Sequence, residues 1–274
     1  MPRTVKVRET ALGGGKLFLI AGPCVLESRE VAFAVCSRLR QLCAELDIAY
    51  VFKSSYDKAN RSSVKSFRGP GPDAGLELLA AVRAEFGVPV ITDVHSPEEA
   101  RRAAQAVDIL QVPALLCRQT DLLLACGQTG LPVNIKKGQF LAPWEMRGPA
   151  EKVRSADNDQ ILLTERGTCF GYNNLVVDMR GLAVMKQFGY PVVFDGSHSV
   201  QLPGAGAGGQ SSGGEREFAP VLVRAALAAG ADGLFLETHP DPDRAMCDGP
   251  NMLPLDQIGK LLASAKRVFE AART

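Results

Sequence analysis

Short apolar runs alternate with longer amphipathic stretches along most of the chain. Eight runs rich in β-branched and aliphatic residues fit strands, and they span 17–21, 48–53, 88–93, 107–112, 131–136, 160–166, 190–195 and 231–237. Between them, apolar residues at helical spacing predict helices, most clearly over 28–46, 72–86, 215–230 and 255–272. Because each short run is almost entirely apolar, we expect strands covered on both faces. The alternation therefore predicts a parallel sheet with helices packed against it.

The number of strand–helix units favours a closed barrel. Eight units without a linker-like break predict a (β/α)8 TIM barrel, with residues 1–274 as a single domain. An open doubly wound sheet is the alternative, but such sheets usually carry a G-x-G-x-x-G loop after an early strand, and none follows the first two runs. Residues 1–15 would form a short N-terminal extension. The glycine-rich segment at about 201–214 is expected to be a mobile loop over the barrel mouth.

Composition excludes several classes of function. Apolar residues make up 46% of the chain, charged residues 22%, and the net charge is +1, so neither nucleic acid nor a membrane surface is an expected partner. No stretch approaches the roughly 20 apolar residues needed to span a bilayer, and the polar N-terminus lacks the apolar core of a signal peptide. The seven cysteines are odd in number and scattered, which indicates a reducing, cytoplasmic location.

Polar side chains gather where the predicted strands end, which is where barrels of this type place their catalytic groups. The residues at or beyond these ends are Cys24, Lys53, Ser55, Lys58, Asn60, Arg61, Asp93, His95, Gln111, Lys136, Lys137, Arg166, Asp195, His198, Glu237, His239 and Asp248. Several cations at one mouth repel one another unless an anion lies among them. A substrate with phosphate or carboxylate groups is therefore expected.

Cys24 stands where the first strand ends and a loop begins. Packing alone could explain a buried cysteine. Barrel closure, however, makes the eighth strand a neighbour of the first and the seventh, which brings Cys24 close to His198, Glu237 and Asp248. Thiolate, imidazole and carboxylates are suitable ligands for a divalent ion of borderline softness. We therefore expect one bound Zn²⁺, Fe²⁺, Mn²⁺ or Co²⁺ ion.

Seven segments resemble one enzyme family over nearly the whole chain. They read AGPCVLES, FKSSYDKANRSSVKSFRGPG, ITDVHSPEEA, LQVPALLCRQTDLL, VNIKKGQFLAP, FDGSHSVQLPG and LETHPDPDRAMCDGPNMLPL. These segments are similar to those of the 3-deoxy-D-manno-octulosonate 8-phosphate (KDO-8-phosphate) synthases. The related DAHP synthases, which use erythrose 4-phosphate, carry a KPRT-type motif where KANRSS stands here, and they are the alternative within enzymes.

The resemblance implies a transferase reaction in lipopolysaccharide biosynthesis. Phosphoenolpyruvate condenses with D-arabinose 5-phosphate and water to give KDO 8-phosphate and inorganic phosphate, with cleavage of the C–O bond of phosphoenolpyruvate. The implied contacts to phosphoenolpyruvate are Lys53, Ser55, Lys58, Gln111, Lys136 and Arg166. Those to arabinose 5-phosphate are Asn60, Arg61 and Ser62, and Gln201 is a further substrate-binding position. The implied catalytic residues are Lys58, Asp93, His95 and Asp248.

The family divides at the position of Cys24. Members with cysteine there belong to the metal-dependent class, and members with asparagine work without metal, so the resemblance implies a metal held by Cys24, His198, Glu237 and Asp248. The ion would polarise the aldehyde or orient the attacking water, and both roles stay open. The family also implies a homotetramer. A barrel that binds phosphate sugars without turnover is the non-enzymatic alternative, which the intact set of cations and ligands disfavours.

Overall fold

Eight parallel strands close into a barrel in the structure, a computed structural model that describes residues 3–61, 63–206 and 212–273. The strands are β3 (Phe18–Gly22), β4 (Ala49–Lys53), β5 (Val90–Asp93), β6 (Ile109–Val112), β7 (Val133–Lys136), β8 (Ile161–Glu165), β11 (Val192–Asp195) and β14 (Gly233–His239). They neighbour one another in chain order, and β14 pairs with both β11 and β3. The predicted (β/α)8 barrel is therefore confirmed.

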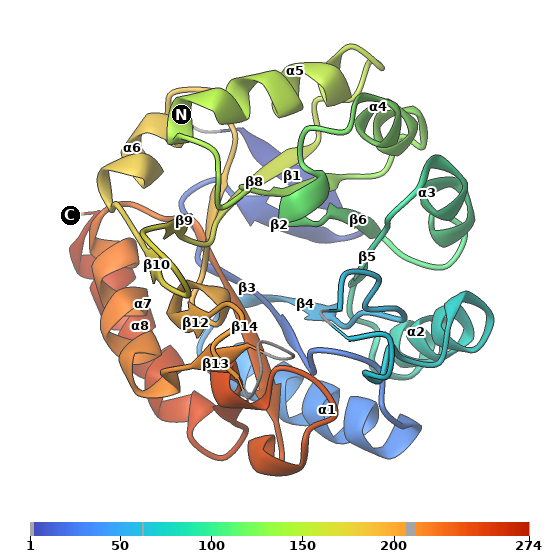
Figure 1. The fold of residues 1–274 in the computed structure, drawn as a ribbon. Helices are drawn as coiled ribbons and strands as arrows, with labels where there is room; N and C mark the ends of the chain where they lie inside the picture. The colour runs from blue at the N-terminus through green and yellow to red at the C-terminus, as the bar shows by residue number, and fades with distance from the viewer. Residues whose placement is uncertain (1–2, 62, 207–211, 274) are drawn as a thin grey trace.

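Helices surround the barrel on the outside (Figure 1). Within the described residues they are α1 (Arg29–Glu45), α2 (Pro72–Phe86), α3 (Pro97–Ala103), α4 (Thr120–Gln128), α5 (Arg147–Arg154), α6 (Arg180–Lys186), α7 (Ala219–Ala228) and α8 (Ile258–Ala271). Short 3-10 helices are η1 (Ala114–Leu116), η2 (Pro143–Met146), η3 (His198–Val200), η5 (Arg216–Phe218), η6 (Pro242–Arg244) and η7 (Gly249–Asn251). None of these helices is both long and apolar enough to cross a bilayer.

Local chemistry fixes where the helices begin. The Ser28 hydroxyl accepts a hydrogen bond from the backbone N–H of Val31 and so caps α1. The continuous helix predicted over 215–230 is wrong in its first turn, which is the separate 3-10 helix η5. Pro220 lies in the first turn of α7, where its missing N–H leaves no helical hydrogen bond unmade.

Alternate residues of each barrel strand point into two separate cores. In β3, Leu19 and Ala21 face the main core between barrel and helices, whereas Phe18 and Ile20 face a second core inside the barrel. This alternation is the period of two that a β-strand imposes on its side chains. Both cores are apolar, which explains why almost every strand position had to be hydrophobic.

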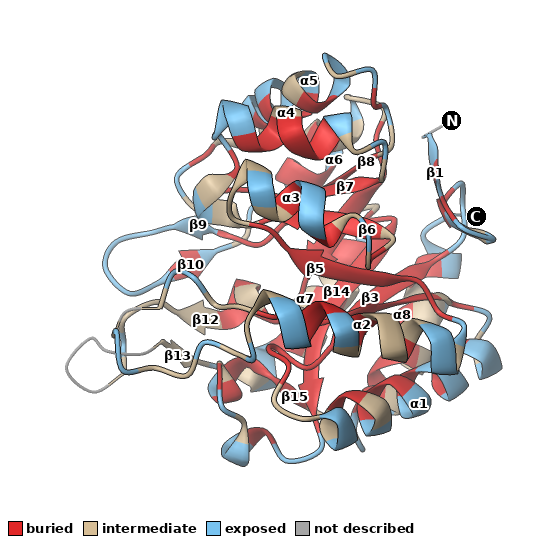
Figure 2. Ribbon diagram, turned by 90° about the vertical axis from the view of Figure 1, so that its right-hand side faces the viewer, coloured by how far each residue is buried: buried red, intermediate tan, exposed pale blue. Residues whose placement is uncertain are grey.

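The N-terminal extension is an antiparallel hairpin that closes the barrel at the amino-terminal ends of its strands. It consists of β1 (Thr4–Val7) and β2 (Thr10–Gly13), and its Val5, Val7 and Leu12 side chains belong to the core inside the barrel. Figure 2 shows β1 at the end of the barrel opposite to β12 (Gln201–Leu202) and β13 (Gly213–Gly214). The hairpin therefore seals the amino-terminal end and leaves the carboxyl ends of the strands open.

Replacing Leu12 with alanine should measure how much the N-terminal hairpin contributes to the free energy of unfolding. Leu12 is fully buried, so the variant loses apolar contacts and leaves a cavity, and we expect the free energy of unfolding to fall by about 2–5 kcal/mol. Denaturant titration followed by circular dichroism would measure the change. Val64→Ala, at a fully exposed position, is the matched control and should leave stability nearly unchanged. Equal free energies of unfolding for the two variants would contradict the packing of the hairpin against the core inside the barrel.

Additional short strands lie at the open end. β9 (Thr168–Cys169) pairs with β10 (Leu175–Val176), β12 pairs with β13, and β15 (Leu253–Pro254) extends the sheet beside β14. The predicted mobile loop at 201–214 thus has a paired stem, while its tip, 207–211, lies outside the described residues.

Candidate active site

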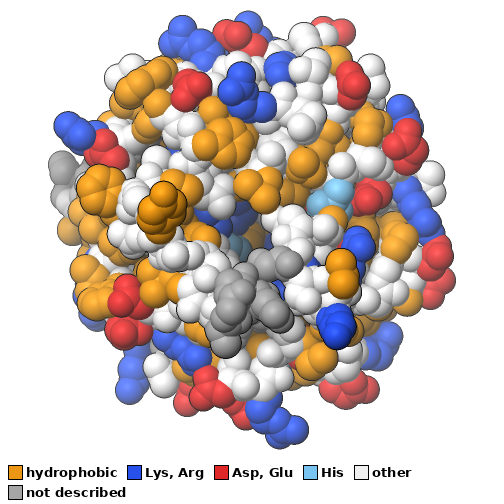
Figure 3. Space-filling view, viewed as in Figure 1, with side chains coloured by type: hydrophobic (Ala, Val, Ile, Leu, Met, Phe, Trp, Pro, Cys, Tyr) orange, Lys and Arg blue, Asp and Glu red, His pale blue; other side chains and the backbone are white. Residues whose placement is uncertain are grey.

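A cavity of about 590 Å³ opens at the carboxyl ends of the strands. Viewed down the barrel, it is a central hollow with Lys and Arg side chains in its depth (Figure 3). The predicted site residues that line it are Lys53, Lys58, Asn60, Arg61, Asp93, His95, Gln111, Lys136, Arg166, His198, Gln201 and Asp248. Cys24, Ser55 and Glu237 are buried against these lining side chains, and Ser62 lies outside the described residues.

Buried lysines face the cavity from two strands. Lys53 ends β4 and is 1% exposed, and its Nζ lies 2.9 Å from Ser55 Oγ and 3.4 Å from Glu237 Oε1. Lys136 ends β7 and pairs with Asp195. Burial lowers the pKa of Lys136 to about 8, against the opposing effect of Asp195. An anion in the cavity would stabilise the charged form of this lysine.

Asp93 is the centre of a hydrogen-bonded network on the cavity wall. It accepts from Ser55 Oγ at 2.5 Å and from Gln111 Nε2 at 2.5 Å. Gln111 Oε1 in turn accepts from Asn134 Nδ2 at 2.8 Å. Burial by itself would raise the pKa of Asp93, but Lys53 and Lys58 outweigh burial and hold it well below its usual range. Asp93 is therefore an ionised, immobilised carboxylate beside the lysines.

His95 is held in one orientation by the helix that follows it. Glu99 Oε2 lies 2.8 Å from His95 Nδ1 and also accepts from the Tyr56 hydroxyl at 2.8 Å. Burial lowers the pKa of His95, but the bond to Glu99 and the charge of Asp93 outweigh it and raise the pKa. The Nε2 atom is then the ring nitrogen available to a ligand in the cavity.

Two arginines present buried donors that make no hydrogen bond to any residue that the structure describes. Arg166 donates from Nη2 to Gln201 Oε1 at 3.1 Å, while its Nη1 is buried and makes no hydrogen bond among the described residues. Arg61 Nε is likewise buried and makes no hydrogen bond among the described residues. Buried polar groups are normally satisfied, so these donors indicate hydrogen bonds that a bound anion completes.

The four predicted metal ligands form two contacting pairs in the site. Cys24 Sγ lies 3.4 Å from Asp248 Oδ2, and His198 Nε2 lies 3.9 Å from Glu237 Oε2. His198, Glu237 and Asp248 can each direct one ligand atom to within 4.8 Å of the other two. Glu237 Oε2 is buried and has no hydrogen-bond partner within the described part of the chain, which is the state expected of a carboxylate oxygen that binds a cation. The donor set therefore fits a divalent ion.

Asp195, at the end of β11, joins the lysine and histidine sides of the site. Its Oδ2 lies 2.8 Å from His198 Nδ1 and also pairs with Lys136, while its Oδ1 accepts from the backbone N–H of His198 at 2.9 Å. This geometry leaves His198 Nε2 facing Glu237, as a metal-binding histidine requires. The sequence placed Asp195 at a strand end but gave it no role.

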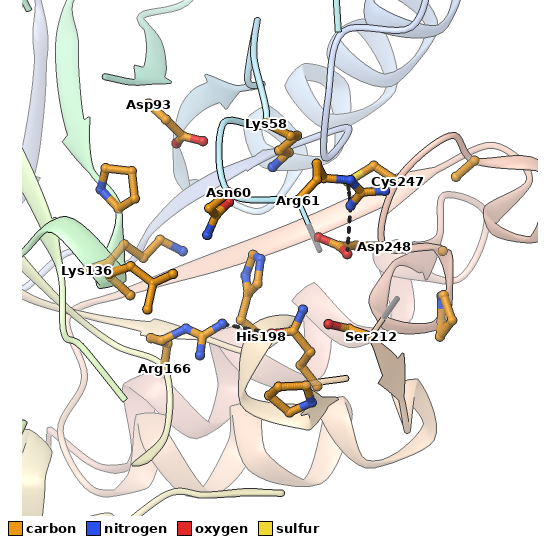
Figure 4. Close-up of a pocket in the computed structure, with 18 of the residues that line it drawn as sticks. Lys58, Asn60, Arg61, Asp93, Lys136, Arg166, His198, Ser212, Cys247 and Asp248 are labelled. Atoms are coloured by element: carbon orange, nitrogen blue, oxygen red, sulfur yellow. Dashed lines mark hydrogen bonds and ion pairs between the residues drawn. The ribbon is translucent and has the colours of Figure 1, made fainter. Parts of the chain in front are cut away.

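Cys247 was not predicted as a site residue. It lines the cavity, and its Sγ lies 3.2 Å from Cys24 Sγ and 3.0 Å from Arg61 Nη1. Figure 4 shows Arg61, Cys247 and Asp248 together on one side of the cavity. Asp248 has a left-handed backbone with φ of 48°, a conformation that is costly for a non-glycine residue and is found at functional sites.

Two other polar residues at strand ends have structural roles outside the cavity. The buried Lys137 Nζ bonds the backbone carbonyls of Gly167 and Leu141 and pairs with Glu165. His239 Nε2 lies 3.4 Å from Glu27. Lys137 therefore connects neighbouring loops through its hydrogen bonds, and it does not line the cavity.

Comparison with known proteins identifies the family. The model of the DAHP synthetase I family matches residues 4–274. The 2-dehydro-3-deoxyphosphooctonate aldolase of Syntrophotalea carbinolica is 58% identical over 263 residues, which are 96% of this chain and 94% of that protein. Proteins of the same name from Nitratidesulfovibrio vulgaris (strain DP4) and Citrifermentans bemidjiense are 60% identical over 89% of both chains and 54% identical over 98% of both chains.

These relatives confirm the resemblance seen in the sequence motifs, because 2-dehydro-3-deoxyphosphooctonate aldolase is another name for KDO-8-phosphate synthase. The match extends over both ends of the barrel, from the N-terminal hairpin to the last helix. The chain therefore belongs to the DAHP synthetase I family.

Proposed function

We propose that the chain is a metal-dependent KDO-8-phosphate synthase, which condenses phosphoenolpyruvate with D-arabinose 5-phosphate and water and releases inorganic phosphate. The names of the relatives support this reaction, and the cavity supports the anionic substrates. We also infer a homotetramer, as the family resemblance implies, and a cytoplasmic location, as the number and spacing of the cysteines indicate. The observation that carries the proposal is the cavity lined by buried lysines and by two arginines with donors that make no hydrogen bond among the described residues.

Phosphoenolpyruvate fits the part of the cavity between Lys53, Lys136 and Arg166. This substrate carries a phosphate and a carboxylate, which matches several cations at short range. Arg166 can donate to one anionic group from Nη1, which makes no hydrogen bond among the described residues, and Lys136 gains the counter-charge that keeps it protonated. The carboxylate of Asp93, fixed by Gln111, lies 3.9 Å from Lys53 and offsets part of that lysine's charge.

Arabinose 5-phosphate fits the side of the cavity lined by Asn60 and Arg61. Arg61 contacts Cys247 and Asp248 at 3.0 Å and 3.7 Å, and its Nε is free of any hydrogen bond among the described residues. A sugar phosphate would complete the guanidinium's donor set. This placement brings the aldehyde end of the sugar toward His95 and the enol carbon of the first substrate, which the reaction requires to meet.

The divalent ion would be held by Cys24, His198, Glu237 and Asp248. When bound, it supplies a Lewis acid that polarises the aldehyde or orients the water. The protein's own contribution is to keep the ligands in place: Asp195 fixes the His198 ring, and Lys53 and Lys58 hold Glu237 ionised. Burial raises the pKa of Glu237, but His198 and these lysines outweigh it and lower the pKa to about 2.

Phosphate release with two aldose phosphates would test the proposed substrates. With phosphoenolpyruvate present, we expect phosphate to appear with arabinose 5-phosphate and at most slowly with erythrose 4-phosphate. The reverse preference would identify a DAHP-type synthase. Binding of phosphoenolpyruvate without phosphate release with either sugar would indicate a binding protein and contradict the proposal.

A further inference from the structure

Two overlapping sets of donor atoms lie around Asp248. One set consists of His198, Glu237 and Asp248, and the other of Cys24, Cys247 and Asp248; within each set the ligand atoms lie within 4.8 Å of one another. The two sets share one carboxylate and differ in their other donors. The first adds a nitrogen and an oxygen, and the second adds two sulfurs. Figure 4 shows the shared carboxylate next to both Cys247 and His198.

The surroundings of Cys247 are not those of a cysteine that only fills space. Its side chain is 2% exposed, yet its sulfur lies 3.2 Å from a second sulfur and 3.0 Å from a guanidinium nitrogen of Arg61. Cys43 and Cys126 belong to the main hydrophobic core, whereas Cys24 and Cys247 share a small separate apolar cluster with Val25 and Met252 at the cavity wall. Arg61 holds the Cys247 sulfur at the cavity wall, next to the thiol of Cys24.

We propose that Cys247 is a second sulfur ligand of the cation site. The inference rests on the metal dependence proposed above and extends it. Soft thiolate donors select thiophilic ions, whereas imidazole and carboxylate donors also suit harder ions. Cys247 therefore joins Cys24, His198, Glu237 and Asp248 around a thiophilic ion, and each thiol releases its proton to solvent as the metal–sulfur bond forms. A harder ion such as Mn²⁺ relies on the nitrogen and oxygen ligands and gains little from Cys247.

Cadmium is the probe that counts the sulfur ligands. Cd²⁺ is thiophilic, and its near-ultraviolet thiolate-to-metal charge-transfer absorption grows with the number of Cd–S bonds. The reduced, metal-free, full-length protein would be titrated with Cd²⁺ to saturation. We expect the absorption of the Cys247→Ser variant to be about half that of the wild type, because one of two Cd–S bonds is lost. Cys247→Ala should behave in the same way.

The matched control is Cys169→Ser, which removes an exposed thiol and should keep the full absorption. Mn²⁺ binding, followed by electron paramagnetic resonance, should be unchanged in Cys247→Ser, which shows that the variant folds and keeps the nitrogen–oxygen side of the site. Full wild-type absorption in Cys247→Ser would overturn the proposal and leave Cys24 as the only sulfur ligand. Failure of the wild type to bind Cd²⁺ or Mn²⁺ stoichiometrically would instead refute the proposed metal dependence.

Discussion

Removal of divalent metal by a strong chelator is expected to abolish condensation, and addition of Zn²⁺, Mn²⁺, Co²⁺ or Fe²⁺ should restore it. A metal ion acting as a Lewis acid is worth several kcal/mol, and each 1.36 kcal/mol changes a rate tenfold, so the rate should fall by roughly 100-fold or more. Glu237 Oε2 is buried, has no hydrogen-bond partner among the residues described, and lies 3.9 Å from His198 Nε2, so a cation would complete its contacts. Phosphate release, measured together with metal analysis of the same sample, would give the result.

Binding of phosphoenolpyruvate provides the internal control for this experiment. Its contacts at Lys53, Lys136 and Arg166 do not include the proposed ligands, so the affinity for phosphoenolpyruvate should change far less than the rate. Circular dichroism should show an intact fold after chelation, because the barrel core is packed independently of the site. Undiminished turnover in protein shown to contain no metal would place the chain in the metal-free mode despite Cys24.

The barrel could be predicted from the chain because its strands are defined by local pattern. The runs ending at Lys53, Asp93, Lys136 and Asp195 end at the same residues in the structure. The N-terminal hairpin was missed because its apolar residues are few and alternate with charged ones. Val5 and Leu12 acquire their partners only when the finished barrel presents its amino-terminal end, and no local periodicity predicts such a contact.

The chemistry of the site was easier to predict than its geometry. Strand ends indicated which polar residues share the cavity, because parallel strands bring their carboxyl ends to one edge. Cys247 escaped notice because its contact with Cys24 joins residues 223 positions apart through an irregular loop. Its position directly before Asp248 was the available signal. The role of Asp195 depends on the turn at η3, which returns the His198 ring to the same carboxylate.

Replacing Asp195 with asparagine should weaken both metal binding at His198 and phosphoenolpyruvate binding at Lys136. The amide has the same shape, but it cannot hold the His198 ring in one tautomer, and loss of such a partner typically weakens metal binding 10–100-fold. Lys136 also loses its buried counter-ion, and its pKa, already lowered to about 8 by burial, should fall further. Because lower pH restores the ammonium, the KM for phosphoenolpyruvate should be raised more at pH 8 than at pH 6.5.

Adding excess metal ion to Asp195→Asn distinguishes the positioning of His198 and Lys136 by Asp195 from a general loss of fold stability. It should recover part of kcat in Asp195→Asn, because occupancy returns, but it should leave the pH-dependent rise in KM, which arises from Lys136. Asp178→Asn, which removes a carboxylate from an exposed pair with Arg180, is the matched control and should match the wild type in metal affinity, kcat and KM. Wild-type metal affinity together with a wild-type KM in Asp195→Asn would show that the contacts of Asp195 to His198 and Lys136 position neither side chain for function.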